Sequence, residues 1–405
     1  MREAEIEKYI PEYVGEICRR FWSVGEEAYL VGGSLRDIML GRAPSDFDLT
    51  ASTAPERTME LFADKRVVPT GIKHGTVTVI YDGEPVEITT FRIDGSYTDS
   101  RHPDAVSFTS RVEEDLARRD FTVNAMAYNS RRGLVDPFGG EADLRAGVIR
   151  AVGDSRRRFA EDALRIMRAF RFSAQLGFSV DTATLSGARE CMGGLSHIAR
   201  ERIGAEFIKL VTSQEPMGAL ELMAETGAMP YVLGSYLPRG ELMAGLSKMP
   251  REDGARLGFL LCDAEESEAQ KILRGLKCSN AQITAALAVI RGARLKIESP
   301  ADGRRLIGAC GAHAKGAVTA SVILGNSPAE AIAWVAENTS ACTIGDLAVS
   351  GRELMEIGIE GREIGKTLER LLSEVIADPR LNTKETMVKL ARQFQMQNAE
   401  CKMQN

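Results

Sequence analysis

The stretch Val31-Gly32-Gly33-Ser34-Leu35-Arg36-Asp37, followed by Asp46-Phe47-Asp48, decides the fold of the N-terminal part of the chain. Residues 28–31 are typical of a short strand that ends in the glycine pair, and residues 34–40 of a helix that starts directly after it. Residues 46–50 predict a second strand, and a strand holds its i and i+2 side chains on one face. The pattern therefore predicts two carboxylates side by side near a turn that lacks Cβ atoms.

Paired carboxylates beside a glycine turn favour metal-assisted chemistry on a polyphosphate. Asp46 and Asp48 are candidate ligands of Mg²⁺, which takes few carboxylates and completes its octahedron with water and substrate phosphates. Two such ions can activate an attacking hydroxyl and stabilise the leaving oxygen of a nucleotidyl transfer. Glu87, in the strand Val86-Glu87-Ile88-Thr89, is the candidate third carboxylate. A lone D-x-D is more often a surface strand or turn, so it is the glycine turn that favours the metal site.

Two arginines are candidate contacts to the phosphates. Gly32-Gly33 would place backbone N–H groups at a helix start, where anions are stabilised. Gly33 and Arg36 are therefore candidate nucleotide contacts, and Asp37 is expected to orient Arg36 or to cap backbone rather than to bind metal. Farther on, Arg118-Arg119-Asp120-Phe121-Thr122-Val123-Asn124 predicts that Arg119 contacts the triphosphate or ribose while Asp120 and Asn124 hold it. The alternative for this second cluster is a helix end with a local ion pair.

A third cluster is Glu161-Asp162-Ala-Leu-Arg165-Ile-Met-Arg168-Ala-Phe-Arg171. A spacing of three residues predicts that Asp162, Arg165 and Arg168 share one helical face, while Ile166, Met167 and Phe170 pack inward. The alternative is an ordinary amphipathic helix. As a base-reading pair, Asp162 would accept from an exocyclic amino group and Arg165 would donate to the adjacent ring acceptor. Cytosine and adenine present that order, whereas uracil and guanine would leave both partners mismatched in a closed pocket.

Composition indicates an ordinary soluble protein of more than one domain. The chain has 405 residues, of which 44% are hydrophobic and 27% charged. A net charge of −6 argues against nucleic acid, but residues 145–171 carry eight arginines against three acids, and such a local stripe can bind a polyanion. The alternative, which a charge run alone favours, is a solvated helix face with ion pairs along it. Seven scattered cysteines and four histidines suit reduced thiols and no zinc site. We expect a cytoplasmic protein without a secretory signal or a membrane span.

The distribution of elements predicts a mixed α/β part up to about residue 150 and helices beyond it. Thr76–Tyr81 and Pro85–Phe91 predict two strands joined by a hairpin at Asp82-Gly83. Arg92–Ser110 interrupts the pattern, and so long a loop is usually functional. From Phe159 onward the helical pattern is almost continuous.

Taken together, the three clusters resemble a known family. The series Gly32-Gly33-x-x-Arg36-Asp37, Asp46-x-Asp48, Arg118-Arg119-Asp120-Phe121-Thr122, Asp136-x-x-Gly139-Gly140 and Glu161-Asp162-x-x-Arg165-x-x-Arg168 is similar in order and spacing to class II tRNA nucleotidyltransferases. These are the bacterial CCA-adding enzymes and poly(A) polymerases within the polymerase-β-like superfamily. The motifs cover residues 30–172, and weaker likeness to the family's neck helix and RNA-binding tail continues at residues 196–203 and 347–384.

The resemblance implies an α+β fold with a polymerase-β-like head followed by an all-helical neck, body and tail. We expect the catalytic head at residues 1–150, the neck at 151–215, the body at 216–298 and the tRNA-binding tail at 299–405. By position, Asp46 and Asp48 would hold metal, and Gly33, Arg36 and Arg119 would contact nucleotide. Asp162 and Arg165 would template the incoming base, and Arg168 and Arg171 would support the nucleotide or the tRNA end.

The implied reaction is attack of the tRNA 3′-hydroxyl on the α-phosphate of CTP, twice, and then of ATP, with release of pyrophosphate and with Mg²⁺ as cofactor. Tyr97–Phe108 resembles the loop that the family requires for A addition, so CC-only activity is not expected. Alternatives on the same scaffold are an A-adding enzyme and a poly(A) polymerase. An alternative from another class is a non-catalytic RNA-binding protein.

Overall fold

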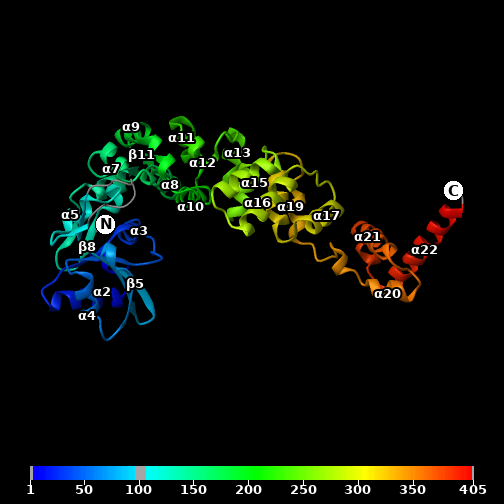
Figure 1. Ribbon diagram of the computed structural model, residues 1–405, viewed down its shortest axis with the longest axis horizontal. Helices are drawn as coiled ribbons and strands as arrows, with labels where there is room; N and C mark the ends of the chain where they lie inside the picture. The colour runs from blue at the N-terminus through cyan, green and yellow to red at the C-terminus, as the bar shows by residue number, and fades with distance from the viewer. Residues whose placement is uncertain (1–2, 96–105, 404–405) are drawn as a thin grey trace. The chain divides into compact units, whose positions relative to one another are not determined.

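The computed structural model describes residues 3–95 and 106–403, which form two compact units, Met1–Leu237 and Pro238–Asn405. The first unit contains every strand of the described residues, and the second consists of helices (Figure 1). The predicted fold class, an α+β head followed by helices, is confirmed. The predicted four-part division of the chain stays a prediction, since the one division between compact units follows Leu237.

A seven-stranded mixed sheet in the order β3-β4-β5-β2-β1-β8-β9 forms the base of the first unit. Strands β2 and β5 pair in parallel, which places Glu87 opposite Asp48, and the other neighbours are antiparallel. The strands of this sheet are β1 (Ala28–Val31), β2 (Asp48–Ala51), β3 (Arg66–Gly71), β4 (Thr76–Tyr81), β5 (Glu84–Thr90), β8 (Ala127–Asn129) and β9 (Gly133–Val135).

Strand β1 runs directly into helix α3 (Gly32–Met39), as the glycine turn predicts. Gly32 has a φ of +69°, a conformation that glycine adopts without a steric penalty. The predicted second strand is shorter than expected, because β2 begins at Asp48 and Asp46 lies in the bend before it. Antiparallel pairing with β1 would set residues 46 and 47 opposite the glycines, where the chain has already turned into a helix, so they find no strand partner there.

The other local predictions for the sheet region are largely confirmed. Asp82 and Gly83 both have positive φ, 51° and 93°, as a two-residue hairpin between β4 and β5 requires. Helix α4 (Pro55–Leu61) begins at its proline. The N-terminal residues form two helices, α1 (Glu3–Glu7) and α2 (Glu12–Ser23), because Pro11 has no N–H for a helix interior and instead stands at the start of α2.

Both ends of the predicted loop Arg92–Ser110 pair with each other. Strands β6 (Arg92–Asp94) and β7 (Val106–Phe108) form an antiparallel ribbon that follows β5. Residues 96–105 lie outside the described part of the chain. The expectation that Tyr97–Phe108 serves A addition therefore falls mostly on residues that the structure does not describe.

Helices complete the first unit. Helix α8 packs against α10 and α11, and β10 pairs in parallel with β11. Their bounds are η1 (Ile72–His74), α5 (Val112–Ala117), η2 (Thr122–Asn124), α6 (Gly140–Ala146), β10 (Val148–Ile149), α7 (Ser155–Glu161), α8 (Leu164–Leu176), β11 (Ser179–Val180), α9 (Thr182–Cys191), η3 (Met192–His197), α10 (Arg200–Val211), α11 (Met217–Thr226) and α12 (Met229–Leu233).

Asp162 does not share a helix with Arg165, so the prediction of one continuous face is wrong. Asp162 ends α7 in an extended conformation, with φ −145° and ψ 104°, and its side chain accepts a hydrogen bond from the backbone N–H of Leu164 at the start of α8. An aspartate that bonds the backbone two residues ahead competes with helical hydrogen bonding and favours a break. Ile166, Met167 and Phe170 are buried, as expected.

The second unit contains two hydrophobic clusters. One gathers residues of α16 to α19 and includes Leu306 and Val318, and the other joins α20, α21 and α22 through Leu354, Leu371 and Met387. The helices are α13 (Gly240–Gly245), η4 (Leu246–Lys248), α14 (Asp253–Leu260), α15 (Glu266–Gly275), α16 (Asn280–Ala293), α17 (Pro300–Cys310), η5 (Gly311–His313), α18 (Ala314–Ile323), α19 (Glu330–Ala336), η6 (Ile344–Asp346), α20 (Gly351–Glu356), α21 (Arg362–Ala377), η7 (Pro379–Leu381) and α22 (Lys384–Met403).

The segment Pro300–Ile323 has the length and hydropathy of a membrane span. It is not one straight helix, because η5 separates α17 from α18 and Gly311 has a φ of +54°. Leu306, Ala317 and Val318 from this segment are buried in the first cluster. Its apolar character is therefore explained by the core of the second unit.

Substitution of Gly140 tests the packing that holds η2 against α6. A Cβ at Gly140 would lie 2.2 Å from the carbonyl oxygen of Thr122, so Gly140→Ala should lower the free energy of unfolding by about 3 kcal/mol. The adjacent Gly139 is the matched control: it has a φ of +73° with nothing within 4 Å, and Gly139→Ala should cost about 1 kcal/mol through backbone strain alone. Urea unfolding measures both, and equal losses would contradict the close contact.

Candidate active site

The predicted site residues surround one cavity of about 580 Å³ in the first unit. Every residue of the predicted set except Glu87 lines it. The complete lining is Gly32, Gly33, Arg36, Asp46, Asp48, Arg118, Arg119, Asp120, Asn124, Asp162, Leu164, Arg165, Arg168, Arg171, Phe172 and Arg202. The glycine turn and the paired carboxylates therefore meet the start of α8, which is more than a hundred residues away in sequence.

Asp46 and Asp48 form the acidic end of this cavity. Burial and the neighbouring charges of Asp46 and Glu87 raise the pKa of Asp48 to about 6, against a smaller opposing effect of Arg119. Glu87 is exposed on β5 and lies opposite Asp48 in the parallel register. Within residues 3–95 and 106–403, no three acidic, histidine or cysteine side chains converge as a ready-made metal site, so a metal role for Glu87 stays a prediction.

Arg36 is fixed behind the glycine turn. Its Nε and Nη2 donate to Asp37 Oδ1 at 3.0 and 2.8 Å, and its Nη1 donates to Asn124 Oδ1 at 2.8 Å. The expectation that Asp37 orients Arg36 is confirmed. Asn124 was expected to hold Arg119, but it holds Arg36 because η2 packs against α3.

Arg119 is held by a residue that the sequence does not single out. Its Nη2 donates to Asp115 Oδ2 at 3.2 Å, and Asp115 is fully buried in α5. The predicted partner Asp120 lies elsewhere, where it accepts from Arg168 Nε at 2.7 Å. Although burial by itself raises the pKa of Asp120, the guanidinium of Arg168 lowers it to about 2. The prediction that Asp120 holds Arg119 is therefore wrong, because Asp120 follows the end of α5 and faces α8.

The guanidinium of Arg165, which also lines the cavity, is anchored by three hydrogen bonds. Its Nη1 donates to Glu161 Oε2 at 2.8 Å and to the Arg158 carbonyl at 3.0 Å, and its Nη2 donates to the Arg118 carbonyl at 3.1 Å. Arginine has five N–H donors, so two remain for a ligand.

Asp162 is anchored in a similar way. Its Oδ1 accepts from the Leu164 N–H and its Oδ2 accepts from Arg202 Nη2, both at 3.0 Å. A carboxylate offers about four acceptor positions, so it can also accept from a ligand. Although Asp162 stands between α7 and α8 and Arg165 lies within α8, both side chains line the cavity, as a base-reading pair requires.

Arg168 and Arg171 pack around Phe172. The carbons at the centres of the Arg36, Arg168 and Arg171 guanidinium groups lie 5.2, 5.2 and 4.0 Å from the centroid of the Phe172 ring. Arg171 Nε also lies 2.6 Å from Glu206 Oε2 on α10. Like charges gathered around one ring are tolerated because cation–π contacts and separate carboxylates stabilise each of them.

Sequence reasoning missed Asp115, Phe172, Arg202 and Glu206 as parts of this site. Arg202 and Glu206 were within reach of a simple signal, because two charged residues on α10 are spaced by four residues and so share one face. Asp115 is one of three consecutive acids in α5, and only its burial, which the sequence does not show, distinguishes it from Glu113 and Glu114.

The lining suits a polyanion with one acidic end. Seven arginines face the cavity against four aspartates, and anionic groups such as phosphates are attracted to such a surface. Asp46 and Asp48 can hold a hard cation, and Asp162 with Arg165 can read an amino group beside a ring acceptor.

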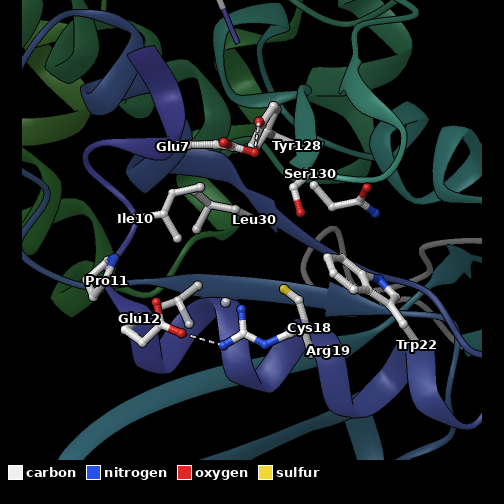
Figure 2. Close-up of a pocket in the computed structure, with 13 residues that line it drawn as sticks. Glu7, Ile10, Pro11, Glu12, Cys18, Arg19, Trp22, Leu30, Tyr128 and Ser130 are labelled. Carbon is white, nitrogen blue, oxygen red and sulfur yellow. Dashed lines mark hydrogen bonds and ion pairs between the residues drawn. The ribbon is translucent and has the colours of Figure 1, made fainter. Parts of the chain in front are cut away.

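A second cavity of about 320 Å³ lies between α1, α2 and the strands β1 and β8 (Figure 2). Figure 2 shows Ile10, Leu30 and Trp22 around it, together with the ion pair of Glu12 and Arg19. Burial raises the pKa of its Cys18 thiol to about 12, so the group stays protonated and is a poor nucleophile. This cavity brings together none of the predicted site residues.

Three protein families match successive parts of the chain. Residues 28–150 match the "Poly A polymerase head domain", and residues 177–237 match the "Probable RNA and SrmB- binding site of polymerase A". Residues 252–391 match the tRNA nucleotidyltransferase domain 2 family. The second match ends where the first compact unit ends.

Full-length relatives are similar over nearly all of the chain. The CCA-adding enzyme of Pediococcus pentosaceus is 35% identical over 94% of this chain and 97% of its own, and that of Latilactobacillus sakei is 36% identical over 95% and 99%. The alignment with the CCA-adding enzyme of Leuconostoc mesenteroides is 47% identical and covers 55% of either chain.

Solved structures of CCA-adding enzymes have the same fold. The crystal structure of the Bacillus stearothermophilus enzyme in complex with CTP aligns with a TM-score of 0.81 and 30% identity, over 96% of this chain and 99% of that one. The Thermotoga maritima enzyme complexed with tRNA aligns with a TM-score of 0.70 over 96% and 98%, at 19% identity, which is a likeness of fold.

The raised pKa of Asp48 predicts how stability depends on pH. The folded-state pKa of about 6 lies above the ordinary value of 3.8, so ionisation of Asp48 costs more in the folded than in the unfolded protein. The free energy of unfolding should therefore fall as the pH rises between these two values. Without divalent cations, Asp48→Asn should therefore be more stable than the wild type by about 1 kcal/mol near neutral pH. Thermal unfolding at a series of pH values measures this, and the gain should shrink toward about pH 4. A gain that does not change with pH would contradict the assignment.

Proposed function

The chain belongs to the family of bacterial CCA-adding enzymes, the class II tRNA nucleotidyltransferases, and from this membership we propose that it adds C, C and A to the 3′ end of tRNA without a nucleic acid template. CTP and ATP are the substrates, pyrophosphate is the product and the cytoplasm is the site of action. The proposal is supported most directly by one observation: the paired aspartates and the Asp162–Arg165 pair line a single cavity.

The acidic end suits a divalent metal ion, and we propose Mg²⁺ held by Asp46 and Asp48, with Glu87 as a further candidate. The two aspartates fit such an ion, because burial and the neighbouring charges of Asp46 and Glu87 raise the pKa of Asp48, and a bound cation would relieve this cost of ionisation. When bound, the metal supplies Lewis-acid stabilisation of charge on the α-phosphate and the leaving pyrophosphate.

The remaining residues bind and select the nucleotide. Arg36 and Arg119, beside Gly32 and Gly33, hold the triphosphate so that its α-phosphate faces the aspartates. The tRNA 3′-hydroxyl then forms a bond to that phosphorus while the bond to the β-phosphate oxygen breaks.

Asp162 accepts from the amino group of cytosine or adenine, and Arg165 donates to the adjacent ring nitrogen. Because both side chains are already anchored within the protein, little ordering is needed when a base binds. Arg168 and Arg171 support the nucleotide or the tRNA end, and the helical second unit contacts the rest of the tRNA.

An extension assay tests the proposed activity. With tRNA that ends before CCA, CTP, ATP and Mg²⁺, the protein should add C, C and A, and removal of divalent ions should stop the reaction. Addition of A alone in the presence of CTP would indicate an A-adding enzyme, and a long A tract would indicate a poly(A) polymerase. Asp46→Ala should bind tRNA without extending it. Binding without extension by the wild type would favour a non-catalytic RNA-binding protein.

Replacement of Arg165 tests base selection. Arg165→Ala should lower the preference for CTP over UTP by about 10²-fold. Uracil is rejected because it mismatches both Asp162 and Arg165, and the variant keeps only the mismatch with Asp162. Arg157→Ala is the matched control, since Arg157 also pairs with Glu161 but is exposed and lies outside the cavity lining. Competition between labelled CTP and UTP measures the preference. An unchanged preference in Arg165→Ala would remove Arg165 from base selection.

A further inference from the structure

Asp115 is a buried carboxylate that does not line the cavity but contacts several segments around it. Its Oδ1 accepts from Arg118 Nε and Nη2 at 2.9 and 2.8 Å, and its Oδ2 accepts from Arg119 Nη2 at 3.2 Å. Longer contacts reach Thr50 Oγ1 on β2, at 3.4 Å, and the backbone N–H of Arg92 on β6, at 3.3 Å. Asp115 therefore joins α5, the strand that carries Asp48, and the start of the β6–β7 ribbon.

The charge of Asp115 is compensated by arginines of the site. Burial by itself raises the pKa of this carboxyl, but Arg118 and Arg119 reverse the effect and hold the pKa below its usual range. A charged group with no exposed surface stays ionised only if such partners stay in place. The position of both arginines is thus strongly coupled to this one carboxylate.

Arg119 links Asp115 to the glycine turn and to Asp48, where the phosphates are proposed to bind. Its Nη1 lies 3.2 Å from the point where a Cβ on Gly32 would stand, so it rests against the glycine turn. Its charge lowers the pKa of Asp48, which places it near the proposed metal ligands. A guanidinium that bonds Asp115 on one side can present its other donors to a phosphate.

Arg118 links Asp115 to Arg165, the proposed base-reading arginine. Its side chain binds Asp115 through two nitrogens, and its backbone carbonyl accepts from Arg165 Nη2 at 3.1 Å. The carbonyl that anchors the proposed base-reading arginine therefore belongs to a residue whose side chain is fixed by Asp115. Asp115 therefore supports both Arg119, through a direct hydrogen bond, and Arg165, through the Arg118 carbonyl.

We propose that Asp115 is a positioning residue for nucleotide selection, which sets Arg119 for phosphate binding and, through the Arg118 carbonyl, Arg165 for base reading. This role rests on the proposed function of the cavity. An asparagine at position 115 keeps the shape but turns one acceptor oxygen into an NH₂ group, which can only donate and would face a guanidinium that also only donates. The substitution should therefore release at least one of the two arginines.

The test compares Asp115→Asn with Asp143→Asn in the full-length protein. Asp143 is the matched control because it is also buried in the first unit and accepts from Arg150 Nε at 3.0 Å, but it lies outside the cavity lining. Thermal unfolding, the KM for CTP and the preference for CTP over UTP are measured for each. Both variants should lose stability, but Asp115→Asn alone should raise the KM about tenfold and lower the preference about tenfold.

The outcomes separate this role from a merely structural one. If Asp115→Asn changes stability but leaves KM and base preference equal to those of Asp143→Asn, the proposal is overturned. If Asp115→Asn does not fold, Arg118→Lys takes its place, because lysine keeps the charge and loses the two-nitrogen contact. Arg118→Lys should raise the KM for CTP and lower the preference for CTP over UTP, each by about threefold. If neither value changes, the proposal is overturned. If the wild type adds no nucleotide, the proposed function itself fails. The affinity for CTP, measured by calorimetry, then replaces KM in the comparison of Asp115→Asn with Asp143→Asn.

Discussion

Seven guanidinium groups face one cavity, and their mutual repulsion is balanced because each of them forms an ion pair with a carboxylate. Arg118 and Arg119 share Asp115, and the other pairs are Arg36–Asp37, Arg165–Glu161, Arg168–Asp120, Arg171–Glu206 and Arg202–Asp162. Removal of any one carboxylate would leave a poorly solvated cation among others. The arrangement of the sheet, α5, α8 and α10 around the cavity is constrained by this pairing.

The same pairing accounts for what the cavity can select. Arginines held by protein carboxylates keep their remaining donors in fixed directions, so a triphosphate and a base find preformed partners rather than mobile side chains. The acidic end is the exception, since Asp48 has carboxylate neighbours and a raised pKa. A cavity lined by seven arginines together with the adjacent carboxylates Asp46 and Asp48 favours a metal–nucleotide complex over a free nucleotide.

Local features of the site were predictable from sequence, whereas its long-range pairs were not. The strand, glycine turn and helix around Gly32 follow from backbone preferences of a few residues, and so does the hairpin at Asp82 and Gly83. By contrast, Asp120 pairs with Arg168, 48 residues away, and nothing in its neighbourhood favours this partner over Arg119. The break at Asp162 depends on one side-chain bond to the backbone, which a three-residue spacing does not reveal.

The central claim is that Asp46 and Asp48 and the Asp162–Arg165 pair serve one bound nucleotide. A crystal structure with CTP and Mn²⁺ tests it most directly, because the anomalous signal locates the metal independently of the nucleotide. We predict a metal between Asp46, Asp48 and the α-phosphate, with the cytosine amino group bonded to Asp162 and the ring nitrogen to Arg165. Metal at the aspartates with the cytosine bound away from α8 would contradict it.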